Sequence, residues 1–77
     1  MAQRRHTPPP VGQVLRSLRI ARDLTQEELG RRAGLSMTYI SLVETGKRNP
    51  TVAAVSALLV VLKISWTEFG AHLDAAA

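Results

Sequence analysis

A glycine at position 34 divides residues 25–48, TQEELGRRAGLSMTYISLVETGKR, into two short segments, and this division constrains the fold more than any other feature of the chain. Apolar residues recur every three or four positions on both sides of it: Leu29, Ala33, Leu35, Ile40 and Val43. That spacing is typical of helices with one buried face. Because glycine adopts the left-handed conformation that ends a helix without steric cost, Gly34 predicts a tight turn between two helices.

The residues that flank these segments are good helix caps. Thr25 stands before the first segment and Glu28 follows three residues later, which is the pattern of a capping box and starts the first helix at Gln26. Ser36 can cap the second helix in the same way. Gly30 lies inside the first helix, where glycine costs about 0.5–1 kcal/mol relative to alanine, so we expect the following helix to cross closely there.

The second helix turns uncharged side chains away from its buried face. They are small or apolar residues: Met37, Thr38, Ser41, Leu42 and Thr45. A helix face in water usually carries charged residues, so this neutral surface indicates close contact with another molecule. The cations Lys47 and Arg48 follow directly, and base edges in a DNA major groove fit a neutral surface beside a cationic loop. The layout is that of a helix-turn-helix, which makes DNA the first partner to consider.

Three stretches of the sequence together closely resemble the lambda-repressor-like family of helix-turn-helix proteins, the Cro and phage-repressor (XRE) type. They are LTQEELGRRAGLSMTYIS, ETGKRNPT and LKISWTEF. The similarity runs from about Val11 to Phe69. The resemblance implies an all-α fold, a compact bundle of about five short helices. It also implies that the protein binds double-stranded DNA.

The resemblance also implies roles for the residues of this region. The outer face of the second helix would meet base edges through Met37, Thr38, Ser41 and Leu42. Phosphates would be bound by Gln26, Ser36, Tyr39, Thr45, the Gly46 backbone, Lys47 and Arg48. For Gln26, a contact with the first base pair is the alternative. For Tyr39 two interpretations stay open, a hydroxyl contact with a phosphate or packing on the neighbouring helix. Phosphate contacts set orientation, and base contacts set sequence choice.

The side chains on this outer face do not define which DNA sequence it would select. The residues that usually make bidentate base contacts, Arg on guanine and Asn or Gln on adenine, are missing from the outer face. Met37 and Leu42 fit thymine methyl groups. Further specificity would come from DNA shape, or from Arg31 and Arg32 if they reach the groove edge; the alternative for these two arginines is a solvated helix face.

One pair of opposite charges is expected to stabilise the fold. Arg19 stands among apolar residues and Glu44 follows Val43, so both side chains would emerge at the edge of the core. A partly buried charge needs a partner. In the resembling family an arginine of the first helix and a glutamate at this position form an ion pair, which implies that Arg19 and Glu44 bond each other. Arg16 and Arg22 show no comparable partner.

Composition agrees with a small DNA-binding domain. Residues 1–50 hold nine of the ten Lys and Arg against four of the six acids, a net charge of +5, whereas residues 51–77 carry −1. The sequence has no cysteine, no metal-ligand cluster and no nucleophile with a base, so we expect no catalytic residue, metal or other cofactor. Its most apolar run, residues 52–62, is far short of the roughly 20 residues that span a membrane. We expect no membrane association and a cytoplasmic protein, placed on the nucleoid when bound to DNA.

The first ten residues, MAQRRHTPPP, differ from the rest in composition. Three consecutive prolines cannot enter a helix interior, which predicts a mobile arm over residues 1–10 and a single domain over residues 11–77. Arg4 and Arg5 would either wrap onto DNA or remain solvated.

The C-terminal part predicts two more helices and a contact with another protein molecule. Thr51 can cap a helix whose core stripe is Val52, Val55, Leu59 and Leu62, and Ser65 with Glu68 can open a last helix by a capping box. The first of these helices is apolar nearly all round, which favours more than one neighbour. We expect a dimer interface at Ala57, Val60, Trp66, Phe69 and Leu73, with completion of the monomer core as the alternative for Trp66 and Phe69. Lys63 stands where the family often has glycine.

These features together predict a sequence-specific transcriptional regulator, a repressor or controller protein, that acts as a homodimer on a palindromic operator. The alternative is a protein-interaction module such as an antitoxin, whose partner would be another protein and in which DNA binding is secondary or lost. The neutral outer face and the apolar fourth helix support this alternative, whereas Lys47 and Arg48 speak against it.

Overall fold

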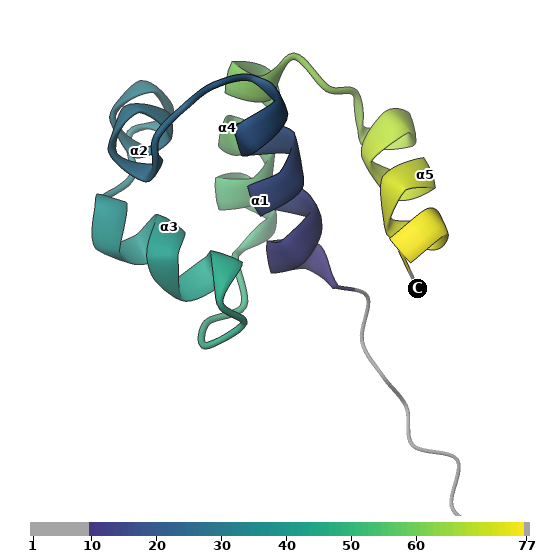
Figure 1. Cartoon of the computed structure of the whole chain (residues 1–77), viewed down its shortest axis with the longest axis horizontal. Coiled ribbons are helices and arrows are strands. Elements are labelled where there is room, and N and C mark those ends of the chain that lie inside the picture. Colours follow the sequence, from purple (N-terminus) through teal and green to yellow (C-terminus); the bar gives the residue numbers. More distant parts are fainter. Residues whose placement is uncertain (1–9, 77) are drawn as a thin grey trace, which may run out of the picture.

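The computed structural model describes residues 10–76, which form five helices and no strand (Figure 1). The helices are α1 (Val11–Ala21), α2 (Gln26–Ala33), α3 (Met37–Glu44), α4 (Val52–Leu62) and α5 (Trp66–Ala76). The predicted all-α bundle of five short helices is confirmed. Of the predicted arm, all residues but Pro10 lie outside the described part of the chain.

The helices begin at the caps that the sequence indicates. The Glu28 N–H donates to Thr25 Oγ1 over 3.0 Å, and the Thr25 N–H donates to Glu28 Oε1 over 2.9 Å, which completes the capping box of α2. The bond from the Thr25 backbone also holds the pKa of Glu28 below its ordinary value. Ser65 and Glu68 form the same box before α5. Each cap therefore satisfies backbone donors that a helix start leaves unpaired.

Two glycines allow backbones to touch inside the bundle. A Cβ atom on Gly12 would overlap the carbonyl oxygen of Val43, so α1 crosses α3 with the two backbones in contact. A Cβ atom on Gly30 would lie 2.6 Å from the Leu35 carbonyl oxygen. The close approach expected at Gly30 is present, although its partner is the turn before α3 rather than α3 itself. The crossing at Gly12 was not predicted, because no local pattern indicates which helix lies against α1.

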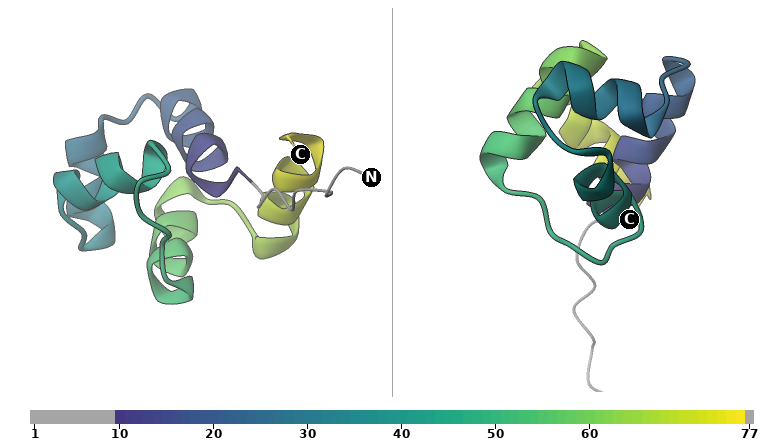
Figure 2. Two further views of the ribbon diagram at one scale, coloured as in Figure 1. Left: turned by 90° about the horizontal axis from the view of Figure 1, so that it is seen from below. Right: turned by 90° about the vertical axis from the view of Figure 1, so that its left-hand side faces the viewer.

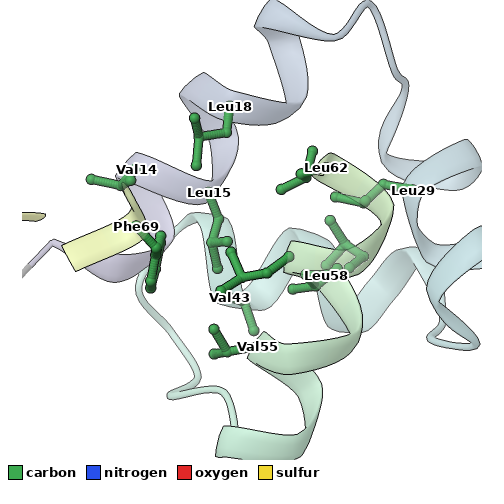
Figure 3. Packing of buried hydrophobic residues seen from close by; sticks show 11 residues of the cluster. Val14, Leu15, Leu18, Leu29, Val43, Val55, Leu58, Leu62 and Phe69 are labelled. Carbon is green, nitrogen blue, oxygen red and sulfur yellow. The ribbon is translucent and has the colours of Figure 1, made fainter. Parts of the chain in front are cut away.

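The core fills the space between α1, α2, α3 and α4, and α5 covers one side of it through Phe69 (Figure 3). Its most deeply buried side chains come from four helices: Leu15, Leu29, Ile40, Val43, Leu58 and Leu62. The expected stripe of α4 needs one correction. Val52 is 76% exposed because it is the first residue of α4 and faces away from the core, whereas Leu58 is fully buried between Val55 and Leu62. The inward face of α4 is thus shifted relative to the prediction.

The end of α4 is held by a contact that the sequence did not reveal. The Arg22 Nε donates to the Leu62 carbonyl oxygen over 2.9 Å, so a cation from the end of α1 binds one of the unpaired carbonyls of α4. Lys63 follows with φ +58°, the left-handed conformation that glycine adopts more readily. Arg22 therefore has a partner after all, and Lys63 ends α4 in the way that the family's glycine would.

The arrangement places α1 between two parts of the molecule. The α2–α3 pair lies on one side of α1 and α5 lies on the other, in both Figure 1 and the left view of Figure 2. Within residues 10–76 no single helix is long and apolar enough to cross a membrane, and α4 with α5 would reach that length only as a pair bent by 101°.

Candidate nucleic-acid interface

The candidate surface is built on α3, which the turn at Gly34 sets against α2. Gly34 has φ +73°, the left-handed conformation expected of it, and Ser36 Oγ accepts from the Tyr39 N–H over 3.0 Å to start α3. Ile40 and Val43 point into the core. The remaining side of α3 lies on the outside of the bundle (Figure 2).

The four residues predicted to meet base edges share that outer side. Met37 and Thr38 are exposed, and Ser41 and Leu42 are half-buried. Within residues 10–76 the hydroxyls of Thr38 and Ser41 have no hydrogen-bond partner. Both hydroxyls are therefore available to donate to or accept from an external group.

Two of the predicted phosphate-binding groups are already used inside the protein. The Thr45 hydroxyl donates to the Ser41 carbonyl oxygen over 2.9 Å, and the Gly46 N–H donates to the Val43 carbonyl oxygen over 3.1 Å. A helix end leaves carbonyl groups unpaired, and the bond from Gly46 satisfies that of Val43, whereas the Ser41 carbonyl accepts from both the Thr45 hydroxyl and the Thr45 N–H. Both donors are therefore used within the protein, and phosphate contacts by Thr45 and Gly46 stay a prediction.

The cationic loop after α3 is ordered by its own backbone. The N–H groups of Lys47 and Arg48 both donate to the Leu42 carbonyl oxygen, over 2.9 and 3.2 Å. Both side chains are exposed. The loop thus holds two positive charges beside the outer side of α3, at a fixed place relative to its C-terminus. Ser36 contributes a hydroxyl hydrogen at the opposite end of α3, because its oxygen acts only as the acceptor for Tyr39.

The predicted ion pair is present and belongs to a larger hydrogen-bond network than expected. Arg19 Nε donates to Glu44 Oε2 over 2.7 Å and Arg19 Nη2 donates to Glu44 Oε1 over 3.0 Å, a bidentate arrangement. Arg19 Nη1 also donates to the Leu24 carbonyl oxygen over 2.8 Å. Gln26 joins this network, since its Nε2 donates to Glu44 Oε1 over 3.0 Å. One carboxylate therefore links α1, the start of α2 and the end of α3.

The contact made by Gln26 changes what that residue can offer to DNA. Its side-chain amide has two N–H hydrogens, and one of them is used by Glu44. The other remains for a phosphate or a base. Nothing in the sequence pointed to this bond, because Gln26 and Glu44 are 18 residues apart and only the packing of α2 on α3 brings them together.

Tyr39 makes contacts through both its ring and its hydroxyl. Its ring is half-buried and packs against the core. Its hydroxyl oxygen accepts from the Thr51 N–H over 3.4 Å, at the start of α4. The Arg48 guanidinium carbon lies 5.5 Å from the centre of the Tyr39 ring. Tyr39 is thus in contact with the middle and with the last residue of the loop between α3 and α4.

The predicted interface residues do not form one patch. Trp66, Phe69 and Leu73 line a groove between α5 and the first turns of α1 and α4, where Val11 and Val52 also lie. Ala57 and Val60 are not on this groove. Phe69 is only 3% exposed and packs in the core, so its assignment to an interface is wrong and it completes the monomer core instead. Trp66 is 51% exposed, with its ring edge-on to Phe69 at a centroid distance of 6.2 Å.

Arg31 and Arg32 are exposed in the last turn of α2. In the described part of the chain, no three side chains of His, Cys, Asp or Glu lie close enough together to hold a metal ion.

Comparison with known proteins identifies a family whose model matches this sequence. A family model described as helix-turn-helix, HTH_3, matches residues 15–69. An uncharacterised HTH-type transcriptional regulator of Sinorhizobium fredii, y4dJ, is 43% identical over 64 residues, which cover 83% of this chain and 83% of that protein. The residues that the family model matches run from α1 into α5 and include the whole candidate surface on α3 and the following loop.

Two solved structures share the fold. The restriction-modification controller protein C.Esp1396I superposes with a TM-score of 0.83 at 29% identity, over 88% of this chain and 87% of the other. The restriction-modification controller protein C.AhdI from Aeromonas hydrophila superposes with a TM-score of 0.75 at 38% identity, over 79% of this chain and 92% of the other.

Proposed function

Because the chain belongs to the helix-turn-helix family, whose members bind double-stranded DNA and act as transcriptional regulators rather than enzymes, we propose that it recognises a roughly palindromic operator as a homodimer. The recognition element is α3. Met37, Thr38, Ser41 and Leu42 meet base edges in the major groove, and Lys47 and Arg48 bind phosphates beside them.

The observation that carries this proposal is the contrast between α3 and the loop that follows it. The outer side of α3 is uncharged, whereas the loop presents two exposed cations with no hydrogen-bond partner for their side chains within residues 10–76. A neutral helix face can approach base edges closely without leaving a charge unpaired. The two cations then neutralise phosphates on the rim of the groove and fix the position of the helix.

Removing both charges of the loop tests this surface. In the variant Lys47→Ala/Arg48→Ala we expect DNA affinity to fall by at least about tenfold, because each charged hydrogen bond contributes about 1.5–3 kcal/mol. The slope of log affinity against log salt should also become shallower by about 2, since roughly two fewer counterions are released. Fluorescence anisotropy over a series of salt concentrations, with an operator obtained by selection from random DNA, measures both quantities.

The matched control is Lys63→Ala, which removes an exposed cation at the other end of α4. We expect this variant to keep the affinity and the salt slope of the unaltered protein. Equal losses in the control and in the loop variant would mean that net charge alone, and not this surface, attracts DNA.

The homodimer is proposed to form through the groove beside α5. The groove is lined by apolar side chains that remain open to solvent, Trp66 and Val52 above all, and also by Gly46 and Arg48 of the loop after α3. The proposal requires a second copy seated on Trp66 and Val52 to leave Arg48 free for a phosphate and to put both recognition helices on the same side of the dimer. Binding to successive major-groove faces requires these helices to be about 34–36 Å apart.

Two single substitutions test which apolar surface joins the copies. We expect Trp66→Ser to raise the dimer dissociation constant by about tenfold or more, because the apolar surface that the Trp66 ring would bury against the second copy is removed. Val60→Ser, on the outer face of α4, is expected to leave the dimer intact. Sedimentation equilibrium measures both constants. A dimer weakened only by Val60→Ser would move the interface to α4, and a protein that stays monomeric at all concentrations would exclude the homodimer.

The outer face of α4 favours a second candidate function. Val60 is 74% exposed on a helix that is apolar nearly all round, which is typical of a surface that another protein covers. In this alternative the chain is an interaction module, such as an antitoxin. A random duplex at low salt separates the two functions, since a module that has lost DNA binding gives no change in anisotropy. The likeness to controller proteins supports a controller role, for which a neighbouring methyltransferase gene would be evidence.

A further inference from the structure

We propose that Tyr39 acts on DNA binding through Arg48, as a positioning residue whose ring holds the guanidinium in place to bind a phosphate. The inference rests on the proposed function, since it assigns Arg48 to a phosphate. It differs from both interpretations that the sequence allowed, because Tyr39 neither binds the phosphate itself nor serves only as packing.

The position of the Tyr39 ring is fixed from three sides. Its backbone N–H is bonded to the Ser36 cap, its ring packs on the core, and its hydroxyl oxygen accepts from the Thr51 N–H. The ring therefore spans from the first turn of α3 to the first residue before α4. It is a rigid element beside an otherwise exposed loop.

The Arg48 side chain, by contrast, is fixed only by this ring. Its guanidinium carbon lies 5.5 Å from the ring centre, within the range of a cation–π contact. Within residues 10–76 the guanidinium has no hydrogen-bond partner and no carboxylate in ion-pair contact, so all its N–H groups remain available. An arginine in water loses much rotamer freedom on binding. Because an aromatic ring already restricts the side chain in the free protein, less of this entropy is lost when the guanidinium binds a phosphate.

The tyrosine hydroxyl can offer DNA only its single hydrogen, because its oxygen accepts a bond from the Thr51 N–H at the start of α4. The planar guanidinium above the ring is the group that matches a phosphate, because it can donate two parallel hydrogen bonds. The ring, and not the hydroxyl, is therefore the functional part of Tyr39.

A double-mutant cycle on the full chain tests this assignment. Tyr39→Leu is expected to weaken binding to the selected operator by about 2–5-fold, which corresponds to an exposed cation–π contact of about 0.5–1 kcal/mol. Arg48→Ala is expected to weaken binding more and to make the salt slope shallower by about 1. In the Arg48→Ala background, Tyr39→Leu should cause no further loss. Tyr39→Phe keeps the ring, and it should restore most of the affinity lost in Tyr39→Leu.

Each outcome of the cycle is decisive. Losses that multiply independently in the double variant would overturn the positioning role. So would a Tyr39→Phe variant as weak as Tyr39→Leu, which would assign the contact to the hydroxyl. If the unaltered protein binds no DNA, the proposed function fails, whereas a binding protein unaffected by Tyr39→Leu contradicts only the role of Tyr39.

A measurement on the unaltered protein covers the case in which Tyr39→Leu does not fold. Protons that lie over an aromatic ring resonate upfield, so the Arg48 side-chain protons next to the guanidinium should show this shift in a proton NMR spectrum of the free protein. Ordinary random-coil positions for these protons would mean that the ring does not hold Arg48, and the proposal would be abandoned.

Discussion

Replacing Glu44 by alanine is expected to lower the free energy of unfolding by about 3–5 kcal/mol, because the Arg19 guanidinium then stays buried without its counter-charge. The side chain of Glu44 is 2% exposed and that of Arg19 is 11% exposed, so water has little access to replace the missing carboxylate. The same change removes the acceptor for Gln26 Nε2. Urea unfolding followed by circular dichroism measures the loss.

Two further variants separate the possible causes. Glu27→Ala removes an exposed acid from the first turn of α2, where such a charge contributes at most about 1 kcal/mol. Glu44→Gln keeps the shape of the side chain and removes only its charge. The ion pair would have no role if Glu44→Ala were as stable as Glu27→Ala, or if Glu44→Gln changed neither the melting midpoint nor the DNA affinity.

Gly12→Ala is expected to destabilise the protein by about 1–3 kcal/mol or more, although alanine is the better helix former. The added methyl group would overlap the Val43 carbonyl oxygen, and its next neighbours are also backbone atoms of α3, which cannot turn aside as a flexible side chain can. Either α1 moves away from α3 or the carbonyl is displaced. Both movements would open the core around Leu15.

Gly70→Ala in α5 is the matched control. A Cβ atom on Gly70 would meet no atom within 4 Å, so this change should stabilise the protein by about 0.5–1 kcal/mol through helix propensity alone. The two variants make the same chemical change inside a helix, and thermal unfolding compares them directly. A Gly12→Ala protein that gains stability as Gly70→Ala does would show that α1 and α3 are not in backbone contact.

The helices themselves were largely predictable from the sequence, because their signals are local. Thr25, Ser36, Thr51 and Ser65 each cap the helix that follows, and Gly34 ends α2 as expected. A cap depends only on residues within one turn of the chain. The class of fold and the place of α3 after the turn at Gly34 followed from these signals together with the resemblance.

What the sequence did not reveal depends on how helices cross. The contact of Gly12 with Val43, the bond from Arg22 to Leu62 and that from Gln26 to Glu44 join residues that are 18 to 40 positions apart. Phe69 could belong to a core or to an interface, and only the position of α5 against α1 decides that it is buried. Side-chain spacing within one helix carries no information about the angle of its neighbour.

Met37 and Thr38 stand clear of the bundle, since both are exposed and neither side chain forms a hydrogen bond within the described part of the chain. The residues that give α3 its stability lie on its opposite side. Under the proposed function, substitutions at these two positions are therefore expected to leave the scaffold intact and to change the promoter that the protein binds. Such separation lets one architecture diversify over evolutionary time, and it makes the pair a natural place to randomise when a regulator with a new target is to be engineered.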